Sequence, residues 1–182
     1  MIRFSLSALQ PRRPAQLLAM AAIILAGGAL PAFAAVPRVV QDEIDPVSLV
    51  PFGIASGTAE EQVSVQGNPF AASGFADAVT RLMTEEFGGG RTRFVPAGSG
   101  AARSPYYALA FNPAAGLLPD ALCGGSPVAT EPARGPIVVR AATCLDGQAQ
   151  SAVTGYLDHA SGPDDPGFAS LVRDLTQRLM AL

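Results

Sequence analysis

The dipeptide Asp146-Gly147 constrains the fold of this chain more than any other feature of its sequence. It separates two β-rich runs, residues 137–144 and 148–156, and Asp-Gly favours the tight turn of an antiparallel hairpin. An apolar stripe of helical period follows a turn rich in proline and aspartate, and it consists of Phe168, Leu171, Val172, Leu175, Leu179 and Met180. We therefore predict a hairpin followed by an amphipathic helix, with an aspartate as its cap and Pro166 in its first turn.

A second apolar stripe predicts another helix near the middle of the chain. Its members recur with the period of one helical face, and they are Phe75, Val79, Leu82, Met83 and Phe87. Three glycines at positions 88–90 end the pattern. Four further β-rich runs predict strands, at residues 47–54, 62–65, 91–95 and 106–111.

The order of these elements indicates the fold class. Both amphipathic helices need an apolar surface, and one face of a sheet supplies it. We therefore predict an α+β two-layer sandwich, with an antiparallel or mixed sheet of five to six strands and two amphipathic helices on one face. Residues 47–182 would form this single domain, and residues 35–46, which lack a period, would form an extended arm.

Residues 112–136 interrupt the regular elements. They contain five prolines and four glycines with little periodicity, which is typical of a long irregular loop. Cys123 lies within this loop and Cys144 lies on the first strand of the hairpin, and the chain has no other cysteine.

The first 34 residues have the order of a secretory signal peptide. Three arginines, Arg3, Arg12 and Arg13, precede an apolar run at residues 17–30, Ala-Phe-Ala follows at residues 32–34, and the whole segment has no acidic residue. The run is shorter than the ~20 apolar residues that span a bilayer. We therefore predict cleavage after Ala34, no membrane span thereafter, and a mature protein that is periplasmic or secreted. No cysteine lies near the site, which argues against a lipid anchor.

The charge balance excludes one class of partner. The chain has 12 Lys+Arg and 15 Asp+Glu, a formal net charge of -3, and loss of the three leader arginines makes it -6. This acidic balance lacks the basic footprint that nucleic-acid binding needs. A hydrophobic fraction of 49% with 15% charged residues indicates a globular chain, and its length suits a monomer or weak oligomer.

An even number of cysteines in an exported chain favours one disulfide. A bond between Cys123 and Cys144 would close a loop of about 22 residues and contribute roughly 3 kcal/mol. It would hold the irregular loop against the sheet by one covalent bond instead of by packing. A redox or metal role is the weaker alternative, since the two thiols form no C-x-x-C motif.

Other residue types that carry chemistry are sparse. His159 is the only histidine, and Asp158 and Ser161 beside it in sequence do not make a triad, whose members must converge from different elements. We expect a solvated loop histidine, no catalytic residue, no metal site and no cofactor. The acid pair Glu85-Glu86 near the end of the first helix is expected to lie on a solvated face.

One local concentration of basic and aromatic residues is a candidate binding surface for an acidic or glycan partner. It consists of Arg91, Arg93, Arg103, Tyr106 and Tyr107. The alternative is that both tyrosines pack within the sheet, as tyrosines on a strand face usually do.

The order of hairpin and closing helix at residues 136–180 resembles that of small exported bacterial cell-envelope proteins of unknown function, including lipoprotein-like accessory domains. The chain lacks the lipidated cysteine of the lipoproteins, and the resemblance implies no site residue. We expect a periplasmic binding or accessory protein without catalytic activity, whose partner is an envelope protein or a glycan. The alternative is a small carboxylate-dependent hydrolase or carbohydrate-active enzyme, because two carboxylates suffice for such chemistry.

Overall fold

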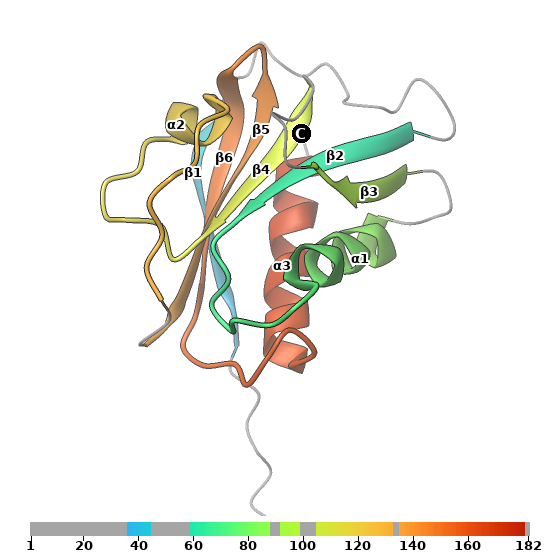
Figure 1. Cartoon of the computed structure of the whole chain (residues 1–182), viewed down its shortest axis with the longest axis vertical. Helices are drawn as coiled ribbons and strands as arrows, with labels where there is room; N and C mark the ends of the chain where they lie inside the picture. Colours follow the sequence, from blue (N-terminus) through green and yellow to red (C-terminus); the bar gives the residue numbers. More distant parts are fainter. Residues whose placement is uncertain (1–35, 45–58, 88–91, 99–104, 133–134, 181–182) are drawn as a thin grey trace, which may run out of the picture. The chain divides into compact units, whose positions relative to one another are not determined.

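A mixed sheet of six strands forms the centre of the fold (Figure 1). The computed structural model describes residues 36–44, 59–87, 92–98, 105–132 and 135–180. In spatial order the strands are β1 (Arg38–Ile44), β6 (Gln148–Leu157), β5 (Ile137–Leu145), β4 (Tyr106–Phe111), β2 (Ala59–Gln66) and β3 (Thr92–Pro96). The predicted α+β sandwich is confirmed.

The hairpin of β5 and β6 is confirmed at the predicted turn. Asp146 and Gly147 both have positive φ, 51° and 83°, as the tight turn requires, and Leu145 pairs with Gln148. β1 and β4 add to the hairpin in antiparallel pairing, whereas β2 runs parallel to both β3 and β4.

Two helices, α1 (Phe75–Phe87) and α3 (Pro166–Met180), cover one side of the sheet, called here the helix face (Figure 1). α1 lies against β2 and β3, and α3 lies against β1, β5 and β6. Their buried stripes meet β-strand side chains in the main core, which includes Val63, Tyr107, Leu109, Phe111, Val139 and Val153. Both helices predicted from apolar periodicity are thereby confirmed.

Asp165 caps α3, as the sequence predicts for an aspartate at this turn. Its carboxylate accepts hydrogen bonds from the backbone N–H of Gly167 at 2.8 Å and from the backbone N–H and hydroxyl of Ser161. These bonds, chiefly the one from the Ser161 backbone, hold the pKa of Asp165 below its ordinary value, because they favour the ionised form.

The opposite side of the sheet, called here the loop face, is covered by the segment between β4 and β5. A five-residue helix, α2 (Pro119–Cys123), corrects the prediction that residues 112–136 are wholly irregular. Leu122 and Cys123 of α2 pack on small strand residues in a second core, which includes Ala108, Ala110, Ala142 and Ala152. Five residues are too few for a period to show, so this helix left no signal in the sequence.

The amino-terminal boundary of the domain also needs correction. Part of the segment predicted as an extended arm, Arg38–Ile44, is extended but pairs with β6 as the edge strand β1. The pairing joins residues more than 100 positions apart in sequence, so no local pattern indicates it. The strand predicted at residues 47–54 lies outside the described residues. Among the helices that are described, none is long and apolar enough to cross a membrane.

Candidate functional site

The loop face is only partly covered, and its open part is the candidate site. Cross-strand partners share a face of a sheet, so Val138, Arg140, Thr154 and Tyr156 lie on the same side as the alanines beneath α2. α2 packs on the alanines. It does not cover the neighbouring cross-strand pairs, whose side chains are larger. Two depressions in the surface lie there.

The first, called the arginine depression, has a volume of about 300 Å³. It is lined by Pro113, Ala114, Ala115, Gly116, Leu117, Val138, Arg140, Thr154 and Tyr156. The guanidinium of Arg140 donates a hydrogen bond to the carbonyl of Leu117, which fixes the loop above the sheet. At the outer side, the Arg38 guanidinium carbon lies 5.0 Å from the centre of the Tyr156 ring, within the range of a cation–π contact.

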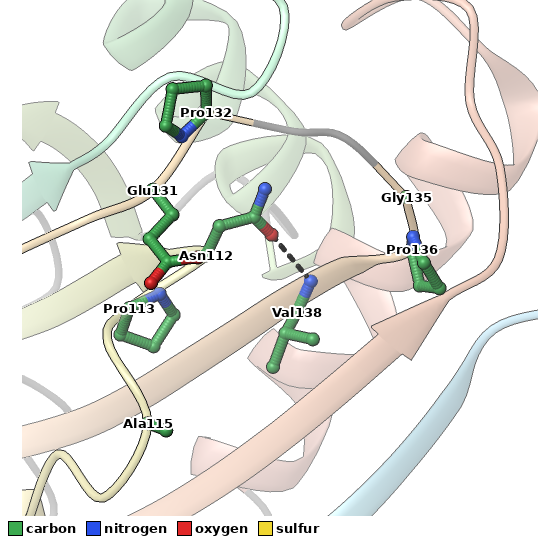
Figure 2. Close-up of a pocket in the computed structure, with 8 residues that line it drawn as sticks. All are labelled: Asn112, Pro113, Ala115, Glu131, Pro132, Gly135, Pro136 and Val138. Atoms are coloured by element: carbon green, nitrogen blue, oxygen red, sulfur yellow. Dashed lines mark hydrogen bonds between the residues drawn. The ribbon is translucent and has the colours of Figure 1, made fainter.

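The second, called the proline depression, has a volume of about 610 Å³ (Figure 2). It is lined by Asn112, Pro113, Ala115, Glu131, Pro132, Gly135, Pro136 and Val138. Asn112 organises its floor from a left-handed conformation, φ 48°. Its side-chain oxygen accepts from the Val138 N–H at 2.8 Å, and its carbonyl accepts from the Glu131 N–H at 2.8 Å.

The two depressions adjoin, because Pro113, Ala115 and Val138 line both. Together they are called the groove. One end presents the Arg140 guanidinium and the Tyr156 ring, and the other presents prolines and Glu131. Glu131 is the only carboxylate among the described residues that line the groove.

The structure separates the described members of the predicted arginine–tyrosine surface. Arg93 lies on edge strand β3, with its side chain 72% exposed, and its guanidinium is 3.4 Å from Glu60. Tyr106 and Tyr107 are both buried and point to opposite faces of β4. Arg91 and Arg103 lie outside the described residues. The binding role of this set stays a prediction, and its tyrosines are placed as the packing alternative expects.

The two tyrosines have distinct structural roles. The Tyr106 hydroxyl donates a hydrogen bond of 2.7 Å to the Cys123 carbonyl, which ties α2 to the sheet. Tyr107 lies in the main core with Phe94 edge-on at 5.4 Å. Burial, and the nearby charge of Glu61, raise the pKa of Tyr107 far above its ordinary value. Burial likewise raises the pKa of Glu61, because a low-dielectric environment disfavours a carboxylate.

The cysteine pair lies at disulfide distance, as predicted. The Cα atoms of Cys123 and Cys144 are 5.4 Å apart, and the bond joins α2 to β5. Packing holds the segment as well, which corrects the prediction that one covalent bond replaces packing. Leu122 is almost fully buried, and the Asp120 carboxylate accepts a hydrogen bond from the Ala149 N–H at 2.9 Å.

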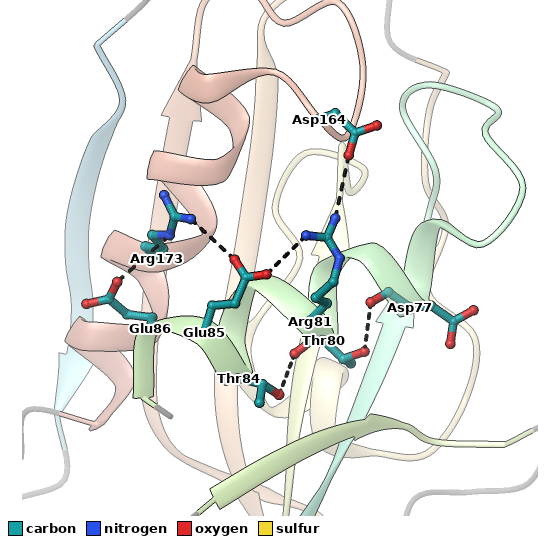
Figure 3. A network of polar contacts seen from close by, with 8 residues as sticks. All are labelled: Asp77, Thr80, Arg81, Thr84, Glu85, Glu86, Asp164 and Arg173. Carbon is teal, nitrogen blue, oxygen red and sulfur yellow. Dashed lines mark hydrogen bonds and ion pairs between the residues drawn. The ribbon is translucent and has the colours of Figure 1, made fainter. Parts of the chain in front are cut away.

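The acid pair of α1 is not simply solvated, since it contacts arginines of both helices (Figure 3). Glu85 lies 3.1 Å from Arg81 within α1 and 3.4 Å from Arg173 of α3, while Glu86 lies 4.0 Å from Arg173. Arg81 also reaches Asp164 at 3.5 Å. These exposed pairs each contribute little energy, but they offset the unfavourable position of two acids at the end of a helix.

His159 lies exposed in the turn after β6, as predicted. The described part of the chain contains no group of three or more histidine, cysteine or acidic side chains that could hold a metal ion.

Sequence reasoning missed the residues that build the groove. The predicted hairpin contains Arg140 and Tyr156, but whether their side chains are covered depends on where α2 ends. The predicted strand at residues 106–111 ends just before Asn112, which falls in the predicted irregular loop. An Asn-Pro dipeptide after a β-rich run was the available signal, since asparagine tolerates the left-handed conformation.

Comparison with known proteins finds no family model, no curated protein and no solved structure that matches this chain.

Proposed function

We propose that this protein is an exported binding or accessory module that holds a partner or ligand in the groove and catalyses no reaction. The observation that carries the proposal is the groove itself. A rigid sheet forms its floor, and a segment fastened by a disulfide forms its wall. Binding residues are commonly carried by loops that a rigid scaffold positions.

The composition of the groove supports binding over the carboxylate-dependent hydrolase. Such enzymes use two carboxyl groups about 5–10 Å apart across a substrate. Glu131 has no second carboxylate beside it among the described groove residues. Prolines, a tyrosine ring and an arginine are instead the groups that bind through apolar contact, stacking and charge.

Export is the second half of the proposal. The leader-like order of residues 1–34 supports it, and so does the cysteine pair, since disulfides persist in oxidising compartments. An exported module in which a disulfide fastens one segment to the sheet fits the role of a binding or accessory protein of the envelope.

A photo-crosslinking amino acid at Ala115, which is exposed and lines both depressions, tests the binding role. The matched control position is Asp77, which is exposed on α1. In native host cells we expect adducts of discrete mass from position 115 and none from position 77. Equal labelling at both positions would contradict the proposal, as would turnover of a glycan or ester substrate that Glu131→Gln abolishes.

A further inference from the structure

We infer that the proline depression binds a neutral oligosaccharide, and that Asn112 and Glu131 recognise neighbouring hydroxyl groups of one of its sugar units. The inference rests on the proposed binding function and names the ligand class of the groove. It draws on the fixed orientation of the Asn112 amide, on the carboxylate of Glu131, and on the backbone groups around them.

The Asn112 side chain offers a hydrogen-bond donor in a fixed orientation. The Val138 N–H can only donate, so the amide oxygen of Asn112 faces it, at 2.8 Å, and the amide nitrogen points away (Figure 2). The backbone N–H of Asn112 also donates to the Val138 carbonyl, at 2.7 Å. Among the described residues, no group accepts a hydrogen bond from the amide nitrogen, so it is available to a ligand in the depression that Asn112 lines.

Glu131 places an acceptor on the same wall. Its backbone N–H donates to the Asn112 carbonyl at 2.8 Å, and the antiparallel bridge between Pro113 and Thr130 continues this pairing. Glu131 is exposed, lines the same depression, and forms no ion pair with any described cation. A donor and an acceptor therefore extend from paired residues at one depression.

This combination selects a ligand group that both accepts and donates. The Glu131 carboxylate would repel an anionic group, and an ammonium group has no lone pair to accept from the Asn112 amide. A hydroxyl group can accept and donate. Two neighbouring hydroxyls, as on a sugar ring, can accept from Asn112 and donate to Glu131 at the same time.

The backbone around this pair disfavours a peptide as the occupant. An extended peptide that adds to a protein surface gains its affinity from main-chain hydrogen bonds. Three residues that line the proline depression are prolines, which have no N–H. Five other residues of the groove already donate their N–H within the protein, namely Asn112, Ala114, Leu117, Glu131 and Val138. The groove therefore recognises its ligand chiefly through side chains.

The rest of the groove supplies apolar surface for the sugar rings, whose C–H faces need such contact. Small-ligand sites combine a mainly apolar lining with a few placed polar groups, and Pro132 and Pro136 are exposed beside the polar pair. Pro113 and Val138 continue the floor into the arginine depression, which the Tyr156 ring lines. The two adjoining depressions, of about 610 and 300 Å³, favour an oligosaccharide over a single sugar.

Isothermal titration calorimetry tests the inference on the protein exported from its full-length gene. The probes are maltotriose, cellotriose, mannotriose and triacetylchitotriose, with the blocked peptide acetyl-Ala-Ser-Ala-amide for comparison. We expect at least one trisaccharide to bind with a Kd below about 5 mM. Its affinity should change by less than about twofold between low and high salt, because the ligand is uncharged. The peptide should not bind.

Two substitutions of Glu131 separate hydroxyl recognition from charge recognition. Glu131→Leu removes the acceptor and should weaken binding at least about tenfold, whereas Glu131→Gln keeps a neutral acceptor and should weaken it only about three- to fivefold. Asn112→Gly fits the left-handed conformation and should weaken binding about tenfold. The matched control Glu60→Leu, at an exposed glutamate of β2, should leave the affinity unchanged. Thermal melts of each variant verify that it is folded.

Each other outcome overturns the inference. These are no binding of any trisaccharide up to about 20 mM, tighter binding of the peptide, or full affinity in Glu131→Leu. An equal loss in Glu131→Gln and Glu131→Leu would assign the site to a cationic ligand instead. Crosslinks at position 115 that persist while no trisaccharide binds would leave the groove function standing and remove only the ligand class.

Discussion

Gly155 lies on the helix face of β6, where α3 packs against the strand. A Cβ atom built there would lie 2.6 Å from the Leu171 Cδ1 atom and 3.2 Å from the Leu175 Cδ2 atom. Both leucines are fully buried, so their methyl groups cannot move without displacing other core atoms. The missing side chain is what lets α3 approach the sheet this closely.

We expect Gly155→Ala to destabilise the protein by about 1–3 kcal/mol, as overpacking of a filled core does. Urea unfolding followed by circular dichroism measures the change. Gly162→Ala is the matched control, because a Cβ at that half-buried turn residue meets no atom within 4 Å, and it should shift stability by less than about 0.5 kcal/mol. Equal effects of the two substitutions would contradict the close packing of α3.

Glu61 is a buried acid on the helix face of β2, only 6% exposed and near Tyr107. Because burial raises its pKa in the folded state, the protonated form is favoured by folding. Its contribution to stability is therefore fully present below the unfolded pKa and is lost as pH rises through the folded pKa.

Glu61→Gln should therefore stabilise the protein at pH 7 relative to the wild type, and the difference should shrink as pH falls from the raised folded pKa of Glu61 toward the ordinary glutamate pKa of about 4.3. Thermal melts across a pH series measure it. Glu60→Gln, at the exposed neighbour that pairs with Arg93, should change stability by less than about 1 kcal/mol. A larger gain from Glu61→Gln at low pH than at neutral pH would contradict the raised pKa.

At the scale of elements, α2 is held by three kinds of contact. The disulfide joins it to β5, Leu122 fills the second core, and the Tyr106 hydroxyl bonds to its last carbonyl. Only the first depends on oxidation. Reduction should therefore loosen α2 without releasing the sheet and the two long helices.

We expect reduction to lower the free energy of unfolding by about 2–4 kcal/mol, because the unfolded chain regains the entropy of the closed loop. Cys123→Ala combined with Cys144→Ala should show the same drop. Urea unfolding measures the global change, and hydrogen exchange at Leu122 measures the local one. Loss of all cooperative unfolding after reduction would contradict the assignment of the main core to the helix face.

At the scale of the whole molecule, local patterns predicted the elements and long-range contacts placed them. The hairpin and both long helices follow from Asp146-Gly147 and from apolar periods, so the sequence suffices for them. β1 was missed because its partner β6 lies more than 100 residues away. The groove was missed for a similar reason, since Arg140 and Tyr156 come from two strands, Asn112 and Glu131 come from the segment between β4 and β5, and no spacing links them.

The compact unit that holds every described element runs Ala34–Leu182, so cleavage after Ala34 would remove none of them. We expect the protein expressed from its full-length gene to begin near Ala35 and to appear in the periplasmic fraction with no free thiol. Amino-terminal sequencing, fractionation and thiol alkylation measure these three properties. Export and the absence of a free thiol are expected together, because the disulfide forms only where the surroundings are oxidising.

Ile24→Arg provides the control, since a charge within the apolar run should block export. This variant should keep Met1, remain inside the cell and carry two alkylatable cysteines, while all described elements are unchanged in sequence. A wild-type protein that retains Met1, or that fractionates with the inner membrane, would contradict export and cleavage. A processed wild-type protein with two free thiols would instead contradict only the disulfide between Cys123 and Cys144. The two halves of the expectation can therefore fail separately.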